Sequence, residues 1–103
     1  MSEYFVAKPK YITRGISNRL SLGMQQLLWE YIHVASNKHE LDYLQVFEFE
    51  REGRKIKIIH KQEVPEFQEV HEIVVADNVN IPSEKVFAID DGDHVTMLFA
   101  SEY

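Results

Sequence analysis

The segment from Leu22 to Ser36 limits the fold most, because its apolar residues repeat with the period of an α-helix. These residues form one stripe: Leu20, Met24, Leu27, Leu28, Tyr31, Ile32 and Ala35. Such a stripe predicts an amphipathic helix that buries one face. Ser21 is suited to cap the first turn, and Asn37 is suited to end the helix. The stripe needs a second layer to cover it.

Most of the remaining chain has the residue pattern of β-strands. The expected strands are short ones at Tyr11–Ile16, Val86–Ile89 and Val95–Phe99 and longer ones at Leu41–Arg51, Arg54–Lys61 and Glu66–Ala76. Glu66–Ala76 could also be helical, but Pro65 before it and its β-branched run favour a strand. Short turns join most of these segments. We therefore expect an α+β fold, with one amphipathic helix packed on a mostly antiparallel sheet of about five strands.

The first two long strands should form a hairpin around Glu52 and Gly53. Cross-strand pairing of like with like, and of acids with bases, predicts the register. The expected pairs are Arg51–Arg54, Phe49–Ile56 and Phe47–Ile58 on one surface, with Glu50–Lys55 and Glu48–Lys57 on the other. A second hairpin should turn through Asp90, Asp91 and Gly92. That loop length would place one apolar set on a common face: Phe87, Ile89, Val95, Met97 and Phe99.

Three apolar residues do not fit the hairpin register, since Leu44, Val46 and Ile59 fall on its charged surface. A bulge could turn the strand, or Tyr4–Ala7 or Val79–Pro82 could cover that surface. If neither happens, the surface is an interface. Trp29, at the flank of the helical stripe, is the fourth interface candidate.

Length and composition describe one ordered domain spanning residues 1–103. The chain has 103 residues, of which 45% are apolar, and it contains no cysteine. The absence of cysteine excludes disulfides, thiolate zinc sites and cysteine nucleophiles. No apolar run is long enough to span a membrane, and the N-terminus lacks a secretory pattern. We therefore expect a cytoplasmic protein.

Candidate chemistry is concentrated in the acidic turn, defined here as Asp90–His94. Its potential ligands are Asp90, Asp91, Asp93 and His94. Their spacing does not fit a calcium-binding loop, and aspartate and glycine are typical of turns, so we expect neither a metal nor a cofactor there. His60 should point inward and pair with Gln45. The chain has no serine-hydrolase or phosphate-binding motif, which disfavours an enzyme.

The charge is unevenly distributed along the chain. The formal net charge is −6, which disfavours broad attraction to nucleic acid or to anionic membranes. Bases dominate from Arg51 to Lys61, whereas acids dominate from Gln62 to Tyr103. The basic hairpin could contact nucleic acid, but its sequence shows no aromatic residues between the charges for stacking on bases.

Three stretches together resemble a known family. They are YITRGI at Tyr11–Ile16, LDYLQVFE at Leu41–Glu48, and the region from IDDGDH to ASEY at Ile89–Tyr103. This pattern is similar to the domain of unknown function 960 family of Firmicutes, small proteins without an assigned activity. The resemblance implies a cytosolic protein of a Gram-positive bacterium, and it carries over no catalytic residue.

Three functional hypotheses follow from these features. The first is a non-enzymatic interaction module that acts through a protein partner or as a homodimer. The second is a metal-binding or small-ligand-binding protein, or an enzyme, that uses the acidic turn. The third is nucleic-acid contact through Arg51–Lys61. A flat apolar patch would favour the first, and a pocket beside the acidic turn would favour the second.

Overall fold

The structure is a computed structural model that describes residues 7–103. Its elements are β1 (Lys10–Ile12), α2 (Arg14–Arg19), α3 (Leu22–Ser36), β2 (Leu44–Glu52), β3 (Lys55–Gln62), β4 (Phe67–Val74), β5 (Val86–Asp90), β6 (Val95–Phe99) and the 3-10 turn η1 (Ala100–Glu102). Residues Tyr4–Val6, which the sequence offered as a cover for the sheet, lie outside the described part of the chain.

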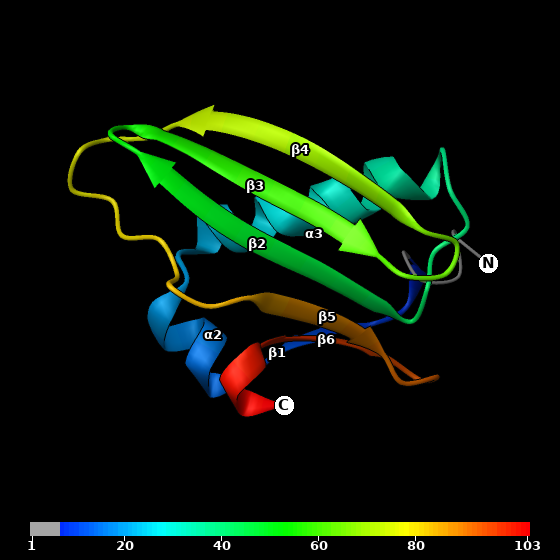
Figure 1. Ribbon diagram of the computed structural model, residues 1–103. Helices are drawn as coiled ribbons and strands as arrows, with labels where there is room; N and C mark the ends of the chain where they lie inside the picture. The colour runs from blue at the N-terminus through cyan, green and yellow to red at the C-terminus, as the bar shows by residue number, and fades with distance from the viewer. Residues whose placement is uncertain (1–6) are drawn as a thin grey trace.

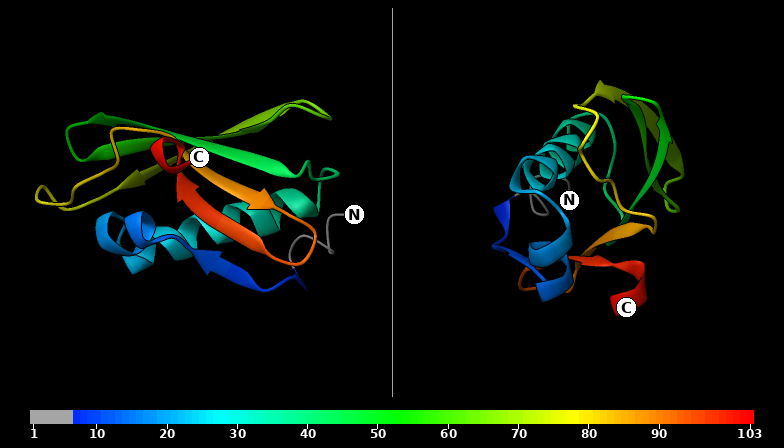
Figure 2. Two further views of the ribbon diagram at one scale, coloured as in Figure 1. Left: turned by 90° about the horizontal axis from the view of Figure 1, so that it is seen from below. Right: turned by 90° about the vertical axis from the view of Figure 1, so that its left-hand side faces the viewer.

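The strands form one mixed sheet in the order β1-β6-β5-β2-β3-β4. The sheet has six strands rather than about five, and its β1–β6 pairing is parallel whereas the other pairings are antiparallel. The sequence missed the parallel pair because it joins the two ends of the chain. Helix α3 lies behind the sheet in Figure 1, and Figure 2 shows the sheet curving around it. We call the helix side the inner face and the opposite side the outer face.

Helix α3 has the predicted bounds and caps. The Ser21 hydroxyl accepts a hydrogen bond from the Met24 amide, and Asn37 ends the helix. Its stripe packs against inner-face side chains to form the core. The fully buried members of this core include Ile16, Leu28, Ile32, Phe47, Ile56, Ile58, Val86, Ala88, Val95, Met97 and Phe99. The expected packing of one amphipathic helix on one sheet face is therefore present.

The strand expected at Tyr11–Ile16 is wrong beyond Ile12, because the chain turns into α2. Thr13 caps this short helix, and its hydroxyl also donates to Glu102 Oε1 at 2.7 Å. The Gly15 amide donates to Glu102 Oε2 at 3.2 Å. A Cβ at position 15 would lie 2.5 Å from that oxygen, so glycine leaves room for the carboxylate. A contact across 87 residues of sequence cannot be read from a local pattern.

The β2–β3 register differs from the predicted one by two residues. Glu52 pairs with Lys55, so the loop consists of Gly53 and Arg54 alone. Gly53 has φ +61° and no other residue of this loop has positive φ, as in a type II′ turn. The predicted faces survive, because a shift of two residues preserves the alternation. The partners change: Phe49 faces Ile58, Phe47 faces His60, Glu50 faces Lys57, and Glu48 faces Ile59.

The β5–β6 hairpin also departs from prediction. Asp90 pairs with Val95, so four residues form the loop rather than three. As a result Phe87 and Ile89 lie on the outer face, while Val95, Met97 and Phe99 lie on the inner face as expected. The segment Glu66–Ala76, which the sequence left between strand and helix, contains strand β4.

Candidate interaction surface

An apolar patch lies on the outer face, over the strands β6, β5 and β2. Register places Val46 beside Phe87, Leu44 beside Ile89, and Phe87 beside Leu98. Leu44, Val46 and Phe87 are half-buried, and the Phe87 ring makes an edge contact with Tyr103 at 5.8 Å between centroids. In the part of the chain that the structure describes, α3 lies on the other face, and the short turn η1 borders the β6 end of the patch (Figure 1). We call the four partly exposed residues, Leu44, Val46, Phe87 and Ile89, the outer patch; Leu98 beneath it is only 8% exposed.

A band of charge borders the outer patch toward β3. Glu48 Oε2 forms ion pairs with Lys61 Nζ at 2.6 Å and with Lys85 Nζ at 3.4 Å. The hydrogen bond from Lys61 holds the pKa of Glu48 below its ordinary value. Lys61 and Lys85 also line a hollow whose apolar side chains are Leu44, Val46, Phe67 and Phe87. Glu63 and Glu66 line the same hollow, so its polar rim carries both signs of charge.

The predicted interface residues divide between the two faces. Leu44, Val46 and Ile59 lie together on the outer face, but Ile59 is only 7% exposed and offers little contact area. Trp29 lies on α3, half-buried against the core, with Lys10 Nζ 5.9 Å from its ring centre. The helix is behind the sheet, so Trp29 is not part of the outer patch. The loop residue Ile81 also packs toward the core rather than over Val46.

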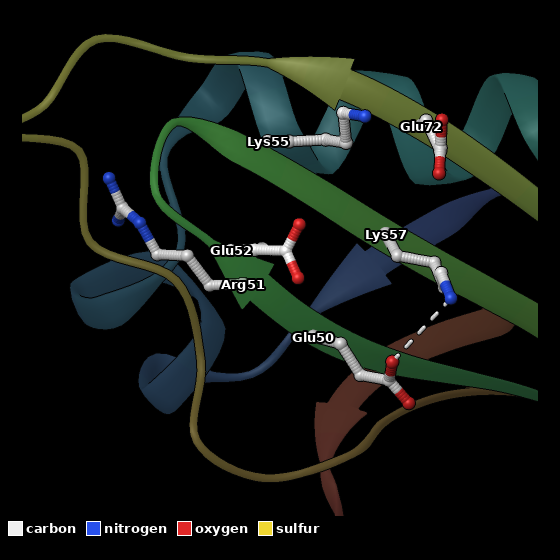
Figure 3. A pocket seen from close by; sticks show the side chains of 6 residues that line it. All are labelled: Glu50, Arg51, Glu52, Lys55, Lys57 and Glu72. Carbon is white, nitrogen blue, oxygen red and sulfur yellow. Dashed lines mark ion pairs between the residues drawn. The ribbon is translucent and has the colours of Figure 1, made fainter.

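The basic hairpin carries alternating charges rather than a basic stripe. Figure 3 shows Glu50, Glu52 and Glu72 interleaved with Lys55 and Lys57 around a small polar hollow. Lys57 Nζ lies 3.9 Å from Glu50 Oε1. Arg51 turns away and donates to backbone carbonyls of the loop after β4, among them that of Asp77 at 3.2 Å. This arrangement lacks the uninterrupted positive surface that attracts a phosphate backbone.

The acidic turn uses its polar groups within the chain. Asp90 accepts hydrogen bonds from Lys8 Nζ at 2.7 Å and from the Gly92 amide at 2.9 Å. Burial alone would raise the pKa of Asp90, but these donors outweigh it and lower the pKa. Asp91 accepts from the His94 amide and lies 2.9 Å from His94 Nε2. Asp93 is exposed on the loop. Within residues 7–103, no three such side chains gather closely enough to hold a metal ion.

Gln45 and His60 form the expected buried pair on the inner face. His60 Nε2 lies 2.6 Å from Gln45 Oε1, and Gln45 Nε2 donates to Gln62 Oε1 at 2.7 Å. The His60 ring stacks on Phe47 at 4.6 Å. Burial lowers the pKa of His60 to about 4. The pair thus exists although the register is shifted, because glutamine is long enough to reach the neighbouring position.

Strand β4 carries a feature that sequence reasoning missed. It is the last strand of the sheet, and its outward valines Val70 and Val74 are 50% and 69% exposed. On its inner side the His71 ring stacks on the Tyr31 ring, with 3.8 Å between their centroids. Glu69 Oε2 accepts a hydrogen bond from Lys38 Nζ at 3.3 Å. The alternation of residues 67–74 could have indicated a half-buried strand, but its edge position depends on the whole topology.

Comparison with known proteins supplies the family. Residues 9–102 match the family described as "Staphylococcal protein of unknown function (DUF960)". The chain belongs to the DUF960 family. This agrees with the resemblance drawn from the three sequence stretches.

A solved structure shares the DUF960 fold seen here. It is described as "Crystal structure of the protein of unknown function from Enterococcus faecalis", with a TM-score of 0.78 and 20% sequence identity. The similarity covers 93% of this chain and 91% of that one, and at this identity it shows the fold alone. The search of curated proteins found no match. Among the described residues, no helix is both long and apolar enough to cross a membrane.

Proposed function

We propose that this DUF960 chain is a cytoplasmic, non-enzymatic binding module, and that a protein partner docks on its outer patch. One observation carries the proposal. Strands β2 and β5 carry apolar side chains on both faces at the outer patch, and α3 covers only the inner one. Contiguous apolar surface rimmed by charge is typical of a protein-binding site.

The chemistry of the rim indicates what such a partner presents. Val46 and Phe87 supply an apolar floor, which suits an aliphatic or aromatic anchor residue. Lys61 and Lys85 stand beside that floor, and Glu48 balances them. Glu63 and Glu66 line the same hollow, so the rim offers both signs of charge. The favoured partner is therefore a protein segment with an apolar anchor flanked by polar residues.

The two other hypotheses find less support in the geometry. The polar groups of the acidic turn, Asp90, Asp91 and His94, are engaged by Lys8 and by each other. The bases of the hairpin alternate with acids, as Glu50 and Lys57 show. Both regions have the arrangement of solvated turns and strand surfaces rather than of a site that awaits a ligand.

Photo-crosslinking tests the proposal in cells of the organism that encodes the chain. A benzophenone amino acid at Phe87 should form a covalent adduct with one protein, and adding Val46→Glu should abolish it. The same photoreactive residue at Glu52, exposed on the outer face at the far end of β2, is the matched control because it lies away from both the patch and the β4 edge. Equal labelling from both positions, or labelling that survives Val46→Glu, would contradict docking on the outer patch.

A further inference from the structure

We propose that the exposed edge of strand β4 is a second interaction surface, whose occupant is the β4 strand of another copy of this chain. The inference is independent of the outer patch. In Figure 1, β4 forms the upper border of the sheet, and no strand of residues 7–103 continues beyond it. An eight-residue unpaired edge presents a row of backbone donors and acceptors that another strand can complete.

The ladder shows which backbone groups point outward. The Val75 amide donates to the Arg54 carbonyl at 2.8 Å, and the register from Lys55–Val74 to Gln62–Phe67 is unbroken. Since hydrogen-bonded and non-bonded pairs alternate in an antiparallel ladder, the odd-numbered residues of β4 direct their N–H and C=O groups toward β3. The even-numbered residues, Gln68, Val70, Glu72 and Val74, therefore direct theirs to the free edge.

A second copy must pair antiparallel if the assembly is to close with two-fold symmetry. Pairing also requires that residues opposite each other point to the same face of the sheet. The two-fold axis must therefore lie where one residue faces its own copy, and not midway between two successive residues. With the axis at Val70, the side chains match. Val70 would face its symmetry mate and Phe67 would face Ile73, while Glu69 would face His71 and Gln68 would face Glu72.

Neighbouring registers are worse. An axis at Glu69 or at Glu72 brings two identical carboxylates face to face, which is destabilising. An axis at His71 sets Val70 opposite Glu72 and Glu69 opposite Ile73. The register at Val70 alone among these pairs apolar with apolar and avoids facing acids. It also uses the outward amide and carbonyl of Val70, which hydrogen bonding across the edge requires.

The pairing explains the exposure of Val70. It is 50% exposed at the centre of the strand, where edges usually carry a charge that prevents association. Register places it beside Ile59 on the outer face. A dimer would therefore bury Val70 against its own copy and join two outer faces into one continuous surface.

Sedimentation across a hundredfold dilution series tests the dimer, because a self-association must respond to concentration. The wild-type chain should pass from dimer to monomer. Val70→Lys, which sets two ammonium groups at the axis, should weaken association about tenfold or more. Val74→Lys is the matched control, since this residue would face Glu66 of the second copy, and it should leave association unchanged or slightly tighter. Each copy has a net charge of −6, so added salt should strengthen the wild-type dimer.

Cysteine cross-linking fixes the register and does not depend on Val70→Lys remaining folded. The natural chain has no cysteine, so Val70→Cys introduces a single thiol. Hydrogen-bonded partners have Cα atoms about 5.5 Å apart, within the range of a disulfide. Val70→Cys should therefore form a covalent dimer on mild oxidation. Val74→Cys should not, since the two thiols would lie about 27 Å apart at the rise of an antiparallel strand.

The sedimentation and cross-linking results together either support or overturn the proposal. A concentration-dependent dimer that Val70→Lys weakens, or a covalent dimer specific to Val70→Cys, supports the β4 edge. A wild-type chain that stays monomeric throughout the series, without a Val70→Cys dimer, overturns the proposal. A dimer that persists in Val70→Lys and does not cross-link through Val70→Cys overturns it too, because association then uses another surface.

Discussion

The inner and outer faces of this sheet are made by the same strands, and residues of similar apolar character alternate between them. Phe47 and Val46 are neighbours on β2, yet Phe47 is completely buried while Val46 is half-buried. The difference comes from α3, which lies over one face alone. The apolar side chains of the inner face therefore stabilise the fold, whereas those of the outer patch remain available for contact with another molecule.

The largest expected effect is on the inner face. Phe47→Ala removes a fully buried ring that packs in the core and stacks on His60. The lost transfer energy and the cavity should together lower the free energy of unfolding by about 3–5 kcal/mol. Urea denaturation measures this. Val46→Ala is the matched control on the outer face and should cost about 1 kcal/mol or less, so equal losses would break the comparison.

A pH series sharpens the contrast, because the inner face also buries an imidazole. Burial lowers the pKa of His60 from its ordinary 6.5 to about 4. The unfolded chain gains this proton near pH 6.5, but the folded chain gains it only near pH 4. The contribution of neutral His60 to the free energy of unfolding is therefore complete above pH 6.5. It is lost as pH falls from 6.5 toward 4, and the total loss is about 3 kcal/mol.

Denaturation midpoints between pH 7 and pH 5 check this expectation. Burial also lowers the pKa of His71, which adds a loss of the same sign. The titratable groups that act on His60 are Glu69, His71 and His39, and those that act on His71 are Glu69 and Lys38. His60→Gln should flatten the pH dependence over that range. A slope identical to wild type would show that His60 is not held neutral.

The sequence predicted the parts of the fold that depend on neighbouring residues. Helix α3 followed from its stripe and from Ser21, and the alternation of β2 and β3 showed which side chains share a face. The β2–β3 register was missed by two residues, since Gly53 could take positive φ as the first residue of a tight turn. Helix α2 was missed because Glu102, from the other end of the chain, holds its first turn.

Only part of the candidate site could be predicted from the sequence, because the rest depends on contacts between distant segments. Leu44 and Val46 stood out as apolar residues on a charged surface. Phe87 was assigned to the wrong face because the loop after β5 is one residue longer than expected. The free edge of β4 could not be inferred before the strand order was known. Local alternation thus predicts faces, while edges and uncovered surfaces depend on long-range pairing.

A smaller effect tests how the inner face is closed at its β6 end. Ile16 of α2 is fully buried in the core, and Glu102 holds the start of that helix. The amide of Phe99 is the main donor that lowers the pKa of Glu102. Glu102→Ala should lower the free energy of unfolding by about 1–2 kcal/mol, as loss of a cap does.

Combining Gly15→Ala with Glu102→Ala separates the contribution of the Glu102 carboxylate from the helix propensity of residue 15. Gly15→Ala should destabilise the wild-type chain, because the new Cβ displaces the Glu102 carboxylate. In Glu102→Ala it should instead stabilise by up to about 1 kcal/mol, since alanine favours a helix over glycine. A thermal-denaturation double-mutant cycle measures this change of sign. If the free-energy changes of Gly15→Ala and Glu102→Ala were additive, the absence of a side chain at Gly15 would not be needed for binding the Glu102 carboxylate.

The central claim is that the outer face is surface and the inner face is core, and Val46→Glu tests it most directly. Its glutamate would stand opposite Lys61 and beside open solvent. Urea denaturation of the monomer should therefore give a free energy of unfolding within about 1 kcal/mol of wild type. A loss of several kcal/mol, comparable with that of Phe47→Ala, would show that the outer face is buried in the chain itself and would contradict the account.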